Sequence, residues 1–66
     1  MSKLVQIAQL LMTLQSNPIV QQIESAVIAG KSWQEVYALL LSILAQQPQG
    51  TTEHAAVQMA ANIANS

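Results

Sequence analysis

Three breaks divide the 66-residue chain into four short segments, and this division limits the fold more than any other feature. The breaks are SNP at residues 16–18, GKS at 30–32 and QQPQGTT at 46–52. Each combines Pro or Gly with Ser, Thr or Asn, the residue types that end one helix and cap the next. The segments between the breaks suit one small domain of short elements.

The spacing of apolar residues inside the segments indicates helices. In the first segment Leu4, Ile7 and Leu11 recur at intervals of three and four residues, with Gln6 and Gln9 on the opposite side. The last segment keeps this spacing with alanines, so it presents a shallow face that could pack on its own subunit or on another chain. We therefore predict an all-α fold, a small bundle of three to four short helices forming a single domain over residues 1–66, with helices at about 3–15, 18–29, 33–46 and 52–64.

Residues at the breaks supply specific start and stop signals. Asn17 is an expected N-cap, and Pro18 follows at the first helical position, where its missing N–H is not needed. Gly30 is an expected helix stop with a positive φ angle. Ser32 and Glu35 form the S-x-x-E pattern of a capping box. The other expected caps are Ser2 and either Thr51 or Thr52.

The composition predicts association with another chain. Charged residues make up only 8% of the sequence and hydrophobic residues 52%, against about 25% charged residues in ordinary domains. A chain of this size buries only about 60% of its unfolded surface, and without cysteine it has no disulfide to compensate. We expect a bundle completed by oligomerisation or by a partner chain, and not a stable monomer at micromolar concentration.

The expected interface centres on the third segment. Trp33 and Tyr37 are i, i+4 neighbours, and the apolar arc around them is wider than one packing contact requires. The predicted interface residues are Trp33, Tyr37, Leu39, Leu40, Leu41 and Leu44, together with Leu10 and Met12 on the first helix. The alternative, that the aromatic pair and its neighbours are simply the core of the bundle, has equal support from the sequence.

Catalysis, cofactors and metals are not expected. Glu35 belongs to the capping box, Glu53 lies in a first helical turn, and the adjacent His54 points about 100° away from Glu53 on a helix. Although GKS matches the end of a phosphate-binding loop, position 25, where that motif requires glycine, is Ser25. We predict no catalytic residue, no cofactor and no metal ligand.

Nucleic acid is not expected as a partner because the chain has two lysines, no arginine and a net charge of −1. Residues 23–40 nevertheless have the outline of a helix-turn-helix, with a Gly-containing turn and a second helix opened by serine. A DNA-binding regulator of this type is therefore kept as the alternative function.

Membrane insertion and secretion are not expected either. The longest nearly unbroken apolar run, residues 36–45 with Ser42 inside it, is about half the ~20 residues that a membrane span needs, and interfacial helices usually carry more basic residues. Lys3 precedes an apolar stretch that glutamines interrupt, and no small-x-small cleavage site follows. We predict a non-enzymatic structural or interaction protein, cytoplasmic or held within an assembly. It would be a small helical subunit of a homo-oligomer or of a larger complex such as a virion, scaffold or adaptor complex.

Overall fold

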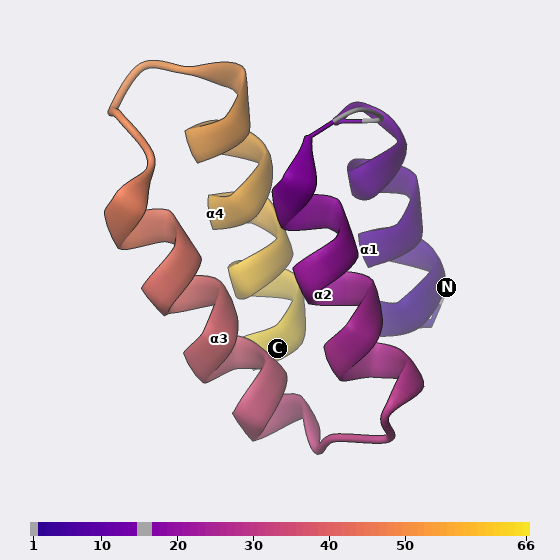
Figure 1. Ribbon diagram of the computed structural model, residues 1–66. Coiled ribbons are helices and arrows are strands. Elements are labelled where there is room, and N and C mark those ends of the chain that lie inside the picture. The colour runs from indigo at the N-terminus through magenta and orange to yellow at the C-terminus, as the bar shows by residue number, and fades with distance from the viewer. Residues whose placement is uncertain (1, 15–16) are drawn as a thin grey trace.

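The computed structural model describes residues 2–14 and 17–66, and this part of the chain folds into four α-helices without a strand (Figure 1). The helices are α1 (Lys3–Met12), α2 (Pro18–Ile28), α3 (Trp33–Gln46) and α4 (Thr52–Asn65). The predicted all-α small bundle is confirmed.

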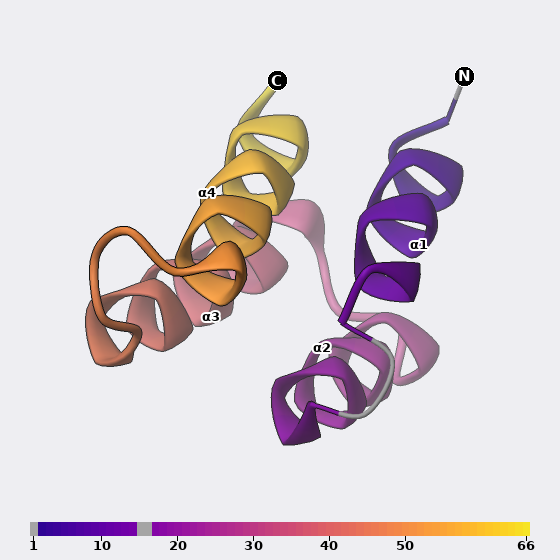
Figure 2. The same cartoon turned by 90° about the horizontal axis from the view of Figure 1, so that it is seen from above.

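The helices pack as three neighbouring pairs. The closest pair is α3 with α4, while α1 packs against α4 and α2 packs against α3. Figure 2 shows α3 and α4 on one side of the molecule and α1 and α2 on the other. Although α1 and α2 are consecutive in the chain, they do not form a packed pair comparable with the other three. The bundle therefore has one open seam, which lies between its first two helices.

The core lies where the four helices face one another. Its buried residues are Ile7, Leu11, Leu14, Ile19, Ile23, Ala26, Val36, Leu40, Ile43, Ala56, Val57, Ala60, Ala61 and Ala64. α4 supplies five of these, four of them alanines, and small side chains allow neighbouring helices to approach closely. The sequence left open whether this helix packs on its own subunit, and the structure packs it on α1 and α3 of the same chain.

Each helix begins with the expected type of cap, a side-chain oxygen that accepts a hydrogen bond from a backbone N–H in the first turn. These bonds are Val5 N to Ser2 Oγ (3.2 Å), Ile19 N to Asn17 Oδ1 (3.0 Å), Glu35 N to Ser32 Oγ (3.2 Å) and His54 N to Thr51 Oγ1 (3.1 Å). Of the two hydrogen bonds of the predicted capping box, the described residues form the one in which Ser32 Oγ accepts from the Glu35 N–H. The Glu35 carboxylate instead lies 4.0 Å from Lys31 Nζ.

The helix ends also follow local chemistry. Gly30 has a φ of +76°, as predicted, and the N–H groups of Gly30 and Lys31 donate to the carbonyls of Val27 and Ala26 at 3.1 and 3.3 Å. This is the Schellman pattern of helix termination.

The first helix ends earlier than expected. The Thr13 hydroxyl donates to the Leu10 carbonyl at 2.6 Å, and the Leu14 N–H donates to the Leu11 carbonyl at 3.0 Å, so the chain tightens into a turn after Met12. Residue 15, the predicted end of this helix, lies outside the described residues.

Candidate functional site

Most of the residues expected at an interface pack within this chain. Leu40 is completely buried in the core, while five others are partly buried and pack against the core: Leu10, Trp33, Tyr37, Leu39 and Leu44. Leu41 and Met12 are exposed. The apolar arc of α3 is therefore used largely by the bundle itself, which is the alternative that the sequence left open. That these residues also contact another chain stays a prediction.

Large apolar side chains that remain exposed gather elsewhere. In the described chain they are Leu4 (51%), Val5 (44%), Met12 (65%), Ile28 (83%), Leu41 (42%) and Met59 (54%). Leu4, Met12 and Ile28 share one location, the seam between α1 and α2, whereas the other three line no part of it. Half of the exposed large apolar side chains thus belong to a single surface.

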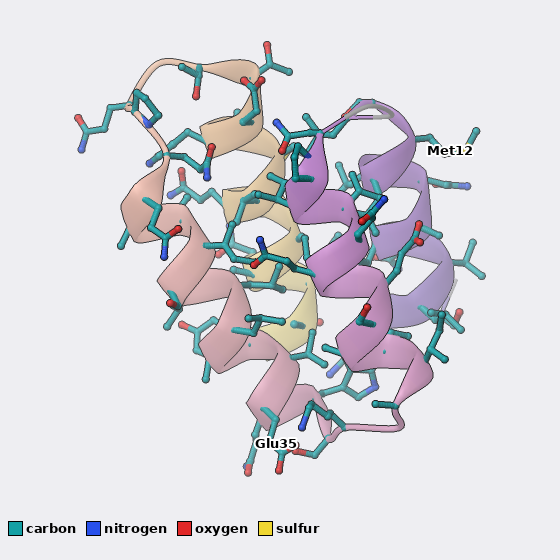
Figure 3. All side chains as sticks on the ribbon, viewed as in Figure 1. Met12 and Glu35 are labelled. Atoms are coloured by element: carbon teal, nitrogen blue, oxygen red, sulfur yellow. The ribbon has the colours of Figure 1, made fainter. Side chains whose placement is uncertain are left out.

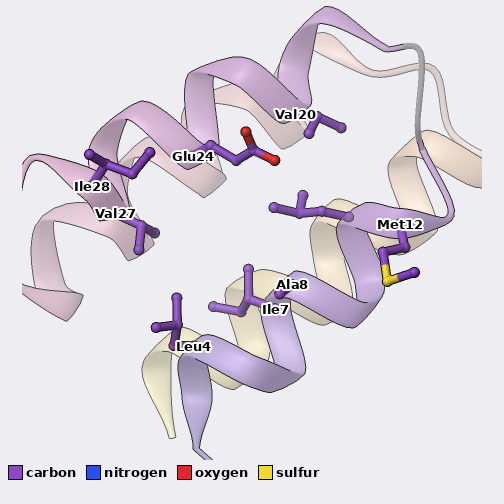
Figure 4. Close-up of a pocket in the computed structure, with 9 residues that line it drawn as sticks. Leu4, Ile7, Ala8, Met12, Val20, Glu24, Val27 and Ile28 are labelled. Carbon is purple, nitrogen blue, oxygen red and sulfur yellow. The ribbon is translucent and has the colours of Figure 1, made fainter.

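This surface is a groove of about 430 Å³ between α1 and α2 (Figure 4). We refer to it as the α1–α2 groove and define it by its nine lining residues, which are Leu4, Ile7, Ala8, Leu11, Met12, Val20, Glu24, Val27 and Ile28. The residues of each helix follow one another at intervals of three, four or one, so each wall is a continuous stripe along its helix.

The groove exists because α1 and α2 turn their most buried residues toward other helices. Ile7 and Leu11 on α1 belong to the central core at 1% and 8% exposure, and they also close the bottom of the groove. On α2, Ile19 and Ile23 enter the same core. The remaining apolar side chains of the walls are covered less: Val20 and Val27 are partly buried against the core, and Leu4, Met12 and Ile28 stay exposed.

Among the nine described residues that line the groove, Glu24 alone is charged. It lies between Val20 and Val27 on the α2 wall, and Figure 4 shows its carboxylate extending into the space between the two helices. The site therefore combines an extended apolar surface with one negative charge near the middle of one wall.

Both lysines of the chain are engaged away from the groove. Lys3 Nζ donates to the Ala64 carbonyl at 3.3 Å and lies 5.8 Å from the centre of the Trp33 ring, a distance that allows a cation–π contact. Because Ala64 is in the last turn of α4, this lysine also stabilises the negative end of that helix. Lys31 lies beside Glu35 at the start of α3.

Other kinds of site lack a supporting arrangement. Across residues 2–14 and 17–66, no three His, Cys, Asp or Glu side chains are grouped so that they could hold a metal ion. In the same residues every buried side-chain nitrogen or oxygen has a hydrogen-bond partner. None of the helices described is both long enough and apolar enough to cross a membrane.

Comparison of the chain with protein-family models, with curated proteins and with solved structures gives no significant match.

Sequence reasoning did not identify this groove, although its signal is present in the sequence. Met12 is the one predicted interface residue that lines it. Leu4 was expected to face inward, and Ile28 was not assigned to any face. A helical projection of residues 18–28 places Ile28 beside Glu24, away from the buried Ile19 and Ile23, because residues four apart share a face. An apolar residue in that position marks a second apolar surface on α2.

Proposed function

We propose that this chain is a non-enzymatic interaction protein, a small helical subunit that joins a homo-oligomer or a larger assembly through its α1–α2 groove. The observation that supports this most strongly is the gathering of Leu4, Met12 and Ile28 on one groove of a chain that otherwise covers its core. Exposed apolar surfaces that are contiguous commonly mark sites of protein contact. Virion, scaffold and adaptor complexes are assemblies in which such a subunit would remain covered.

The form of the groove favours a polypeptide over a small molecule. Small-molecule sites usually combine enclosure with several placed polar groups, whereas this groove runs along two helices and has the single carboxylate of Glu24. Two parallel stripes at helical spacing are the surface into which the apolar face of a third helix packs.

The alternative, a DNA-binding regulator of the helix-turn-helix type, has less support. Its affinity would require several cations on one surface, because each phosphate contact neutralises one charge. Lys3 and Lys31 are the two cations of the chain, and they engage Ala64 and Glu35 on different parts of the bundle.

The proposal can be tested by selecting binders from a displayed library of helical peptides of about 15 residues, the length at which isolated helices become marginally stable. The full chain is the bait, and the selected peptides are then measured against the double variant Met12→Gln with Ile28→Gln. Met59→Gln is the matched control, because Met59 is 54% exposed and Met12 is 65% exposed, but Met59 does not line the groove.

We expect the double variant to weaken binding at least tenfold, because covering each of these apolar side chains is worth about 1.5 kcal/mol or more. The control variant should change affinity by less than about twofold. Sedimentation velocity of the same proteins shows whether the occupant is a second copy of the chain. Selected peptides that bind both variants equally, together with a sedimentation profile that the double variant does not change, would exclude the groove as the contact surface.

A further inference from the structure

We propose that the occupant of the α1–α2 groove is an amphipathic helix of a different polypeptide, with a Lys or Arg beside its apolar stripe that pairs with Glu24. This inference rests on the proposed function and names the chemistry of the partner. Three observations support it: the length of the groove, the position of Glu24 in its wall, and the lack of a suitable apolar helix face on the described part of a second copy of the chain.

The length of the groove sets the length of the docked segment. α1 has 10 residues and α2 has 11, so each wall extends over about 15 Å at ~1.5 Å per residue. A helix of about three turns covers this distance. It would present apolar side chains at i, i+3, i+4 and i+7, the same spacing that the groove walls themselves show.

The negative charge of Glu24 favours a partner helix with a positive charge. A helix docked between the walls would exclude water from the side of Glu24 that faces the groove, and an unpaired carboxylate becomes more costly as water is removed. A basic side chain near the middle of the docked helix offsets this cost and adds a charge-assisted hydrogen bond. An acidic residue in that position would be repelled, so Glu24 also discriminates between partners.

A second copy of this chain does not offer such a helix. Among the described residues, its exposed large apolar side chains outside the groove are Val5 on α1, Leu41 on α3 and Met59 on α4, no more than one on any helix, so they form no stripe. Its lysines are engaged at Ala64 and Glu35.

Groove-to-groove pairing of two copies is also unfavourable. It would bring the Glu24 carboxylates of both copies to the same apolar interface, where like charges oppose association. The charge pattern therefore favours a partner that carries the missing cation.

The test uses two synthetic peptides taken from the strongest groove-dependent binder, identical except for Lys or Gln at the central position beside the apolar stripe. Their affinities are measured for the unaltered chain, for Glu24→Gln, and for Glu35→Gln as a control with the same change in net charge. Glu35 lies in the first turn of α3, at the opposite end of the bundle from Met12 in Figure 3.

We expect Glu24→Gln to weaken binding of the Lys peptide about fivefold, the effect of losing one partly covered ion pair. Glu35→Gln should leave that affinity unchanged, and the Gln peptide should bind all three proteins equally. Added salt should weaken the Lys peptide on the unaltered chain and have little effect on the Gln peptide.

Two results would overturn the inference and leave the proposed function standing. One is equal binding of the Lys and Gln peptides to the unaltered chain and to Glu24→Gln. The other is a dimer of the chain that depends on Met12 and Ile28 and excludes the peptides. If no selected peptide depends on the groove and no such dimer forms, both proposals are overturned.

Discussion

Leu40→Ala and Ile28→Gln should differ greatly in their effect on stability, although both remove a large apolar side chain. Leu40 is completely buried, and replacing such a leucine by alanine costs about 3–4 kcal/mol because the lost contacts leave a cavity. A 66-residue domain has a total stability of about 3–10 kcal/mol, so this substitution removes a third of it or more.

Ile28 is 83% exposed in the chain, so about a sixth of its surface is buried. Full burial of an isoleucine is worth about 1.5–3 kcal/mol, and the corresponding share is only about 0.3–0.5 kcal/mol. Ile28→Gln should therefore leave the free energy of unfolding nearly unchanged.

Urea denaturation followed by circular dichroism measures both effects. With a slope of roughly 1 kcal/mol per molar urea for a small domain, Leu40→Ala should lower the midpoint by about 3 M or prevent folding, and Ile28→Gln should lower it by less than about 0.5 M. Ile23→Val is a milder substitution at another fully buried position and should cost about 1 kcal/mol if Leu40→Ala does not fold. A loss at Ile28 as large as the loss at Leu40 would refute this assignment of buried and exposed faces.

Three further predictions concern the helix boundaries and the surface charge. Ser32→Ala should cost about 1 kcal/mol of stability in the same denaturation assay, because the Glu35 N–H loses its acceptor at 3.2 Å; an unchanged midpoint would contradict the role of Ser32 as a cap. Gly30→Ala should cost about 1–2 kcal/mol, since nothing lies within 4 Å of the added methyl group and the φ of +76° alone opposes it; a stabilised variant would disprove that conformation. Fluorescence anisotropy with labelled duplex DNA should show no binding below micromolar concentration near physiological salt, and tight binding that weakens steeply with salt would restore the helix-turn-helix alternative.

Local features of the fold were predictable from the sequence because they depend on residues close together in the chain. Asn17 with Pro18, Gly30 and Ser32 each determine a helix boundary through their own backbone or side chain, and the structure confirms all of them. The end of α1 was placed too late because no Gly or Pro marks it. At the turn after Met12 the Thr13 hydroxyl donates to the Leu10 carbonyl, and a single threonine is a weak signal for a helix end in a sequence.

The groove was not predictable because it depends on which helices become neighbours. The apolar arc of α3 suggested an unpaired surface, but Trp33, Tyr37 and Leu44 are partly covered by the packing around the core. The shallow alanine face of α4 left open whether this helix packs on its own subunit, yet α1 packs against it and the hydrogen bond from Lys3 to the Ala64 carbonyl joins the two helices. Because α1 packs against α4 and α2 packs against α3, the seam between α1 and α2 stays open. The spacing of apolar residues along the sequence does not indicate which helices pair in this way.

The most direct measurement of docking at the α1–α2 groove is a titration of the isotope-labelled chain with a selected Lys peptide, followed through its backbone amide resonances. We predict that the largest shifts fall on the two groove walls, around Leu4 to Met12 and Val20 to Ile28, and that Met12→Gln with Ile28→Gln removes them. Shifts concentrated instead on the outer face of α3 around Leu41, unaffected by that double variant, would contradict docking in the groove and place the contact on the surface that the sequence first indicated.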